Sequence, residues 1–306
     1  MINHYDTDSR RIMTKFAGSR LFRAFSYAVT IFCLVLCSIM PVSASTIHTK
    51  SPKGLLITPA TQFATVNAGK TQAGDFGVAN HTANPLTISF SIKQFTVDNY
   101  SYNYNFNPPN NNWIKISLPQ VTLLPGQTQT VPYNINIPIG TQPGGNYFIL
   151  LASATLTSGN LTSKVQAASL LYLTVNGKLT YTSRLVHDYI QRVMFGTQLA
   201  YHFSVIDTGN DYFFIYTSGA LHGLSTKPAM TTPVTHLVIP GKIRQFTGTI
   251  PHPLLPGVYR ATYGYTTDTG AAVQRSQLIL YMPPWSIAVV LLVLLAGNVW
   301  YVKREK

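Results

Sequence analysis

The chain has 306 residues, with 22 Lys and Arg against 9 Asp and Glu, so its formal net charge is +13 although only 10% of residues are charged. This length suggests about two domains, and 46% hydrophobic residues exclude a disordered chain. Glutamate occurs once, at position 305, and six aspartates lie between residues 45 and 284. Catalysis by paired carboxylates, or by a carboxylate-bound metal, therefore has few candidate positions.

Residues 1–44 have the pattern of a secretory signal peptide. Five Arg and Lys residues precede an apolar run at 24–40, and small residues follow at 42–45. We expect cleavage after Ala44 or Ser45, with an uncleaved membrane anchor as the alternative. Both cysteines lie in the apolar run, so the exported part has no disulfide framework. Lipidation at Cys37 is disfavoured because Leu36 stands where a small residue is usual.

Residues 54–175 are predicted to form a first immunoglobulin-like β-sandwich. Apolar and polar residues alternate at 87–92 and at 131–137, as in strands that bury one face. Pro-Gly pairs at 125–126 and 143–144 mark turns, because proline presets one turn dihedral and glycine accepts a positive φ. Many short strands separated by such turns are typical of a sandwich.

A strip of aromatic residues in this region is a candidate ligand-binding surface. It consists of Tyr100, Tyr102, Tyr104, Phe106 and Trp113. The first four alternate with polar residues, which in an extended ribbon places the rings on one side and the amides on the other. Sugar rings stack on aromatic side chains and hydrogen-bond to amides, so a glycan is the expected ligand. The alternative is that the rings only cover one end of the sandwich.

Residues 178–282 are predicted to form a second immunoglobulin-like sandwich, because they repeat the turn pattern of the first. Pro-Gly pairs recur at 240–241 and 256–257, and the interval from the proline at 138 to that at 143 equals the interval from 251 to 256, five positions in each. Asn80 and Asp207 take matching positions before a turn. A single long sandwich is the alternative.

The ordered motifs of the first half also resemble a known family. They are Gly54-Leu-Leu-Ile-Thr-Pro, Val78-Ala-Asn, Trp113-Ile-Lys, Leu124-Pro-Gly-Gln, Ile135-Asn-Ile-Pro and Pro143-Gly-Gly-Asn-Tyr. Together they are similar to the N-terminal domain of the WxL-interacting cell-surface proteins of Gram-positive bacteria. That resemblance implies a peptidoglycan-associated first domain, a second domain that contacts partner or host proteins, and one membrane helix. It implies no catalytic residues.

Two Asp-Thr-Gly triplets, at 207–209 and 268–270, are the motifs closest to catalysis, because paired aspartates activate water in aspartic proteases. Their separation of 61 residues (268 minus 207) is too short for two protease lobes, and each triplet suits a turn. A calcium site at Asp207 and Asp211 offers too few oxygens. The histidines lack metal-ligand spacing, and no phosphate-binding loop is present. We predict no enzyme, no metal site and no cofactor.

Residues 285–302 are predicted to form a transmembrane helix, followed by the basic tail 303–306. Eighteen largely apolar residues span ~27 Å as a helix, enough for a thin hydrocarbon core. Trp285, Trp300 and Tyr301 suit the membrane interfaces, and the tail belongs in the cytoplasm by the positive-inside rule. The predicted location is the cell membrane, crossed once, with both sandwiches outside the cytoplasm.

The predicted function is a membrane-anchored, non-catalytic binding protein. Its expected partners are peptidoglycan or another cell-wall glycan, and also surface proteins. No nucleic acid is expected, since Lys and Arg are scattered singly between the predicted signal peptide and the basic tail. The alternative is an assembly or chaperone-like subunit that binds exported surface proteins by β-strand addition, which uses exposed sheet edges.

Overall fold

Alternating apolar and polar residues form strands along most of the chain. The computed structural model describes residues 54–158, 161–223 and 229–304. Within these ranges the one helix is α3 (Pro284–Arg304), and the remaining elements are strands. The predicted all-β class is therefore confirmed. The predicted signal peptide, 1–44, lies outside the described residues.

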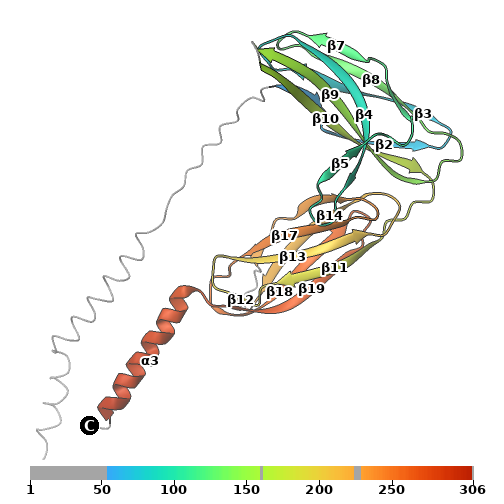
Figure 1. Cartoon of the computed structure of the whole chain (residues 1–306). Helices are drawn as coiled ribbons and strands as arrows, with labels where there is room; N and C mark the ends of the chain where they lie inside the picture. The colour runs from blue at the N-terminus through green and yellow to red at the C-terminus, as the bar shows by residue number, and fades with distance from the viewer. Residues whose placement is uncertain (1–53, 159–160, 224–228, 305–306) are drawn as a thin grey trace, which may run out of the picture. The chain divides into compact units, whose positions relative to one another are not determined.

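The first half contains two sheets. One has the order β1 (Leu55–Thr58), β3 (Thr71–Asn80), β8 (Thr128–Asn136), β6 (Ile114–Ile116). The other has the order β2 (Thr61–Asn67), β10 (Leu161–Asn176), β9 (Gly144–Ser158), β4 (Leu86–Val97), β5 (Tyr104–Asn107), and β7 (Gln120–Leu123) also pairs with β4. Figure 1 shows β4, β9 and β10 running side by side.

Strand alternation places the first core between these sheets. On β4, Ile88 is fully buried while Thr87 and Ser89 are exposed, as the sequence pattern predicts. Phe76 of β3 and Leu150 of β9 are also fully buried in this cluster. Side chains from both sheets therefore share one apolar layer, and its burial stabilises the packing by about 25 cal/mol per Å² of apolar surface.

The second half repeats this layout. One sheet has the order β11 (Ser183–Ile190), β13 (Gln198–Asp207), β17 (Ile243–Pro251). The other has the order β12 (Val193–Met194), β19 (Ala272–Tyr281), β18 (Gly257–Thr267), β14 (Phe213–His222), β15 (Ala229–Met230), and β16 (Val234–Val238) also pairs with β14. Its core includes Phe203, Ile215 and Tyr265.

Matching turns close the two halves. Gly126 has a φ of 81° and donates its N–H to the carbonyl of Asn80, 2.7 Å away. Gly241 has a φ of 72° and donates to the carbonyl of Asp207, 2.9 Å away. Each glycine follows a proline and takes the left-handed conformation that other residues disfavour. The same contact therefore occurs at the positions that the repeat pattern equates.

A third buried cluster contains residues from both halves. Phe95, Tyr147 and Tyr172 from the first half are buried with Ile239 from the second, and Tyr212 packs against them. The rings of Tyr172 and Tyr212 have centroids 5.4 Å apart. This aromatic cluster covers part of the outer face of the sheet that contains β10.

The predicted transmembrane helix at 285–302 is wrong. Helix α3 occupies this segment, but no helix among the described residues is both long and apolar enough to cross a membrane. Ser286, Gly297 and Asn298 interrupt the apolar residues, and tryptophan and tyrosine at the ends contribute less hydropathy than aliphatic side chains do. The predictions of a single-pass membrane location and of a cytoplasmic tail at 303–306 are corrected with it.

Candidate functional site: a strand paired on one side

Strand β10 is paired along its two edges to different extents. With β9 it pairs from Leu161 to Val175. With β2 it pairs only from Leu170 to Asn176, in parallel. The first half of β10, residues 161–169, therefore has a strand partner on one side only within the described structure. An unpaired strand edge presents N–H and C=O groups to which another strand can bond.

Side-chain hydrogen bonds at Ser169 mark the boundary between the open half and the paired half, which begins at Leu170. The Ser169 hydroxyl donates to the carbonyl of Pro59 at 2.7 Å and accepts from Gln62 Nε2 at 3.2 Å. The next N–H, of Leu170, donates to the carbonyl of Ala60 at 2.9 Å. These bonds fix where β2 starts to cover β10, so the open segment has a defined end.

Two inward side chains of the open segment are small and apolar, between Ser163 and Ser169. Val165 and Ala167 are half-buried and pack against the first core, as does Leu156 of β9. Further along β10, Leu171 and Leu173 are fully buried. The core is thus less completely covered beside the open edge than beside the paired one, which leaves apolar surface that an added strand can bury.

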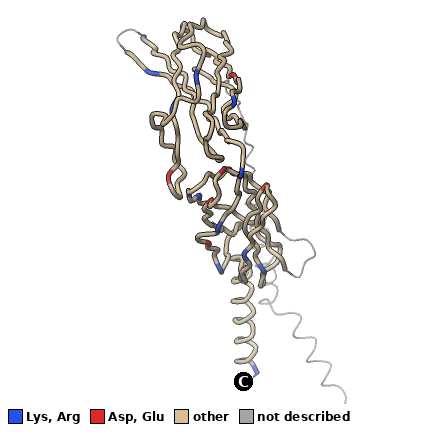
Figure 2. Tube along the Cα trace, turned by 90° about the vertical axis from the view of Figure 1, so that its right-hand side faces the viewer, with Lys and Arg blue, Asp and Glu red and all other residues tan. Residues whose placement is uncertain are grey.

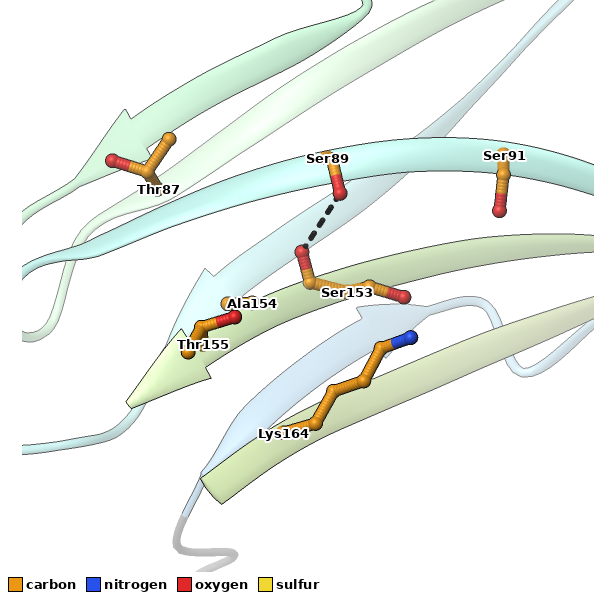
Figure 3. A pocket seen from close by; sticks show the side chains of 7 residues that line it. All are labelled: Thr87, Ser89, Ser91, Ser153, Ala154, Thr155 and Lys164. Carbon is orange, nitrogen blue, oxygen red and sulfur yellow. Dashed lines mark hydrogen bonds between the residues drawn. The ribbon is translucent and has the colours of Figure 1, made fainter. Parts of the chain in front are cut away.

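The outward side chains beside this edge form a shallow polar groove. Figure 3 shows the hydroxyl groups on the face that adjoining strands share with Lys164. The groove is lined by Thr87, Ser89 and Ser91 of β4, by Ser153, Ala154 and Thr155 of β9, and by Lys164 of β10. Ser89 donates its hydroxyl to the carbonyl of Ser153 at 3.2 Å. No carboxylate lines it.

Strand β19 in the second half also has a long open edge, because β12 pairs only with Leu280 and Tyr281. Its inward side carries one charged residue, Arg275. Arg275 lies opposite the buried Tyr263 and approaches Asp188 of β11, with Nε 3.7 Å from the carboxylate. Tyr263 also donates to Asp188, at 2.6 Å. Inward charges at a sheet edge oppose strand addition, so the two open edges differ.

The two Asp-Thr-Gly triplets form turns, which confirms their sequence interpretation. Asp207 Oδ1 accepts the N–H of Gly209 at 2.7 Å. Gly270 donates to the carbonyl of Thr267 at 3.1 Å in the hairpin between β18 and β19. The carboxylate whose charge affects the pKa of Asp207 is that of Asp211, not that of Asp268, which is exposed. No paired acid of the protease type is assembled in the described part of the chain.

Burial perturbs both carboxyls of this turn. Desolvation raises the pKa of Asp207 to about 7, against the lowering effect of the Gly209 N–H, and the Asp211 carboxylate raises it further. Desolvation also raises the pKa of Asp211, although Thr174, Tyr212 and Tyr181 donate hydrogen bonds to it. The described residues contain no group of three or more potential metal ligands.

The aromatic strip is divided between several surroundings. Tyr100 and Tyr102 have φ of 66° and 58°, so an extended ribbon does not begin until β5 at Tyr104. Tyr102 is largely buried against the second half: its hydroxyl accepts the N–H of Ile239 at 2.8 Å, and the Arg244 guanidinium lies 4.3 Å from its ring centroid.

The other members of the strip lie elsewhere. Tyr104 and Phe106 stay together on β5, with rings stacked at 6.3 Å and roughly half exposed. Tyr100 is half-exposed and bonds through its N–H to Ile243, while Trp113 packs against the first core. The structure thus brings two of the five together. A ligand-binding role for these residues stays a prediction.

Comparison with known proteins gives only distant likenesses. No family model and no curated protein matches the chain. Among solved structures, the class 5 fimbriae chaperone CfaA is 10% identical, with a TM-score of 0.41, over 75% of this chain and 100% of that one. A chain of the Salmonella enterica SafA pilin–SafB chaperone complex is 12% identical, with a TM-score of 0.39, over 76% of this chain and 98% of that one. A chain of the Acinetobacter baumannii CsuC–CsuE chaperone–tip subunit complex is 12% identical, with a TM-score of 0.39, over 74% of this chain and 99% of that one.

These findings correct the predicted family and partners. The solved structures named here are fimbrial chaperones rather than WxL-interacting proteins, and no family model supports the predicted membership. The expected partners peptidoglycan, cell-wall glycan and membrane are corrected as well, because the proteins found beside the chaperones in those structures are a pilin and a tip subunit. The motifs misled because Pro-Gly turns and Ile-Pro strand ends occur in many sandwiches.

Sequence reasoning did not find the open half of β10. Residues 161–169 alternate only weakly, and nothing in their composition distinguishes a paired edge from an open one. The available signal was length: 144–176 holds two long strands, whereas 61–67 can cover only seven residues of the second.

Proposed function

We propose that this protein is a non-catalytic, chaperone-like assembly subunit that binds exported surface proteins by β-strand addition. In this proposal the chain consists of two tandem immunoglobulin-like sandwiches, at 54–175 and 178–282. The observation that carries it is the one-sided pairing of β10 over residues 161–169. The fimbrial chaperones named above match with TM-scores below 0.5, so the proposal depends on this edge itself.

Strand addition fits the open segment for two reasons. Its backbone offers unused hydrogen-bonding groups along one side, and buried backbone groups in proteins are almost always paired. Its inward side offers the half-buried Val165 and Ala167, so an added strand with apolar inward residues gains both hydrogen bonds and apolar burial. A partner subunit that lacks one strand of its own sheet also has unpaired backbone groups and uncovered apolar side chains, which the same pairing would satisfy.

A comparison with the open edge of β19 indicates why a partner strand would bind β10 instead. On β19, inward Arg275 and the neighbouring Asp188 would be buried by an added strand at a large desolvation cost. On the open half of β10 the described inward positions carry no charge. Of these two edges, the one on β10 is therefore suited to a partner strand.

The test uses the full chain and a ten-residue peptide of alternating valine and threonine. We expect the peptide to slow amide hydrogen exchange at residues 161–168, and Val165→Lys to weaken its binding at least about tenfold, because strand addition would bury the new charge. Gln277→Lys, at an inward position of β19, is the matched control and should leave binding unchanged.

A second readout addresses the chaperone role. The protein should suppress aggregation of a secreted β-sandwich protein from which one edge strand has been deleted, and Val165→Lys should lose this effect while remaining folded. The melting temperatures of variant and wild type are compared, because Val165 also packs against the first core. Unaltered exchange at 161–168 with the peptide, or full suppression by Val165→Lys, would show that β10 is not the binding edge.

A further inference from the structure

The sheet face beside the open edge carries positive charge without a carboxylate. Along β4 the outward residues run Ser89, Ser91 and Lys93, and along β10 Lys164 is exposed on the same face. The acids of the first half lie elsewhere: Asp75 is on β3 of the other sheet, and Asp98 follows β4. Figure 2 shows how thinly charged residues are spread along the described part of the chain.

Lys164 is the charged residue nearest to an incoming strand. It lies directly opposite Thr155 of β9 and lines the hydroxyl groove of Figure 3. The one ion pair of the described residues joins Arg275 and Asp188 in the other half, so Lys164 has no carboxylate partner there. Its neighbour Gln166 is already bonded, through Nε2 to Ser153 Oγ at 2.8 Å.

Strand geometry fixes what lies beside Lys164. A strand added to β10 would run about 4.8 Å from it, and the residue opposite Lys164 on the outward face would have its Cβ about 5 Å away. That residue would stand on the side of Lys164 away from Thr155. An acidic side chain there pairs with the ammonium group, whereas a basic one meets a like charge.

We propose that the open half of β10 selects partner segments with a carboxylate on the outward side next to Lys164, and with uncharged inward residues beside Val165 and Ala167. This inference rests on the proposed strand addition and names the partner: an alternating segment that is apolar inward and acidic at one outward position. Opposite charges on neighbouring strands attract modestly, and salt screens them, so the selection is graded rather than absolute.

The test compares two peptides that bind the same edge. Both are ten-residue alternating valine and threonine peptides, with the central outward threonine replaced by glutamate in one and by lysine in the other. With the full chain at low ionic strength, we expect the glutamate peptide to bind about three- to tenfold more tightly. Lys164→Glu should reverse the order, and Lys164→Gln should abolish the difference.

Three further measurements distinguish charge selection at Lys164 from strand addition itself. Lys93→Glu changes the same face on β4, two strands from the edge, and should change the preference less. High salt should reduce the difference in wild-type affinity between the glutamate and the lysine peptide, because salt screens the charges. If both peptides bind the wild type and Lys164→Glu equally, charge selection is refuted and strand addition survives. If neither peptide binds, both proposals are overturned.

Discussion

Asn80 and Asp207 occupy equivalent turns and differ by one donor group. Asn80 is fully buried, and its Nδ2 donates to the carbonyls of Asn84 and Leu123, each at 2.9 Å. Asp207 is equally buried, but its Oδ2 has no hydrogen-bond partner among the described residues. A buried carboxylate oxygen without a donor disfavours the ionised form, which agrees with the pKa of about 7.

Asp207→Asn should therefore remove a pH dependence of stability. The folded pKa, about 7, lies above the ordinary value of 3.8. The folded state then binds more protons than the unfolded state between about pH 4 and 7, so wild-type stability falls as pH rises through this window. In urea unfolding at pH 5 and pH 8, the variant should lose this difference and be the more stable form at pH 8.

Asp268→Asn, at an exposed hairpin tip, is the control and should keep the wild-type slope. An unaltered pH dependence in Asp207→Asn would mean that Asp207 is ionised when buried.

Among the elements, the connection from β4 to β5 differs most from its sequence expectation. Alternating tyrosines predict a ribbon, but Tyr100 and Tyr102 take left-handed conformations that are uncommon outside glycine and asparagine. The segment is held by bonds to the second half: Asn99 Oδ1 accepts the N–H of Ile243 at 3.0 Å, and Tyr102 accepts that of Ile239. Tertiary contacts therefore override the local strand pattern.

Tyr102→Phe tests how much the hydroxyl contributes. The change leaves the N–H of Ile239 without its acceptor while the ring can still stack under Arg244. We expect a loss of about 1 kcal/mol of stability, which corresponds to a melting temperature about 2–4 °C lower.

The matched control is Tyr104→Phe. The Tyr104 hydroxyl makes a long, weak hydrogen bond to Tyr172 Oη, at 3.5 Å, and the Tyr104 ring is half-exposed. Its melting temperature should change by less than the Tyr102 variant's. Equal changes would show that the bond to Ile239 does not stabilise the fold specifically.

On the scale of the whole molecule, the aromatic cluster couples two separate cores. Tyr172 contacts Phe63 and Phe95 of the first half, at 5.4 Å each, and Tyr212 of the second half at the same centroid distance. Each core has its own buried residues, so each half could unfold independently. The cluster makes the unfolding of one half costly for the other.

Tyr172→Ala should separate the two unfolding events. Calorimetry of the wild type should give a single transition, and the variant should give two, with a loss of about 3–5 kcal/mol for truncating a buried aromatic ring. Ile88→Ala, confined to the first core, should lower the melting temperature but keep one transition. A single transition in Tyr172→Ala would show that the halves are coupled by other contacts.

Much of the architecture follows from the sequence. The period-two patterns at 87–92 and 131–137 predict strands because a strand between core and solvent must alternate. The Pro-Gly turns predict where strands end, and their repetition equates Asn80 with Asp207. These are local properties, set by backbone sterics and by hydrogen bonds over a few residues.

Local patterns were insufficient for the tail and for the family. Eighteen largely apolar residues at 285–302 looked sufficient for a membrane span, yet no helix among the described residues is both long and apolar enough for one. Short turn motifs looked diagnostic of one family, although the same sterics produce them in many sandwiches.

The sequence by itself determined the strands, the turns and the absence of cysteine after position 37, because each depends on residue type and near neighbours. Only the tertiary structure decided that β2 pairs with only one half of β10, that Arg275 lies beside Asp188 on the inward side of the β19 edge, and that Tyr102 packs against Arg244. These features depend on pairing between segments more than one hundred residues apart, or on strand register, and neither is encoded in a local pattern.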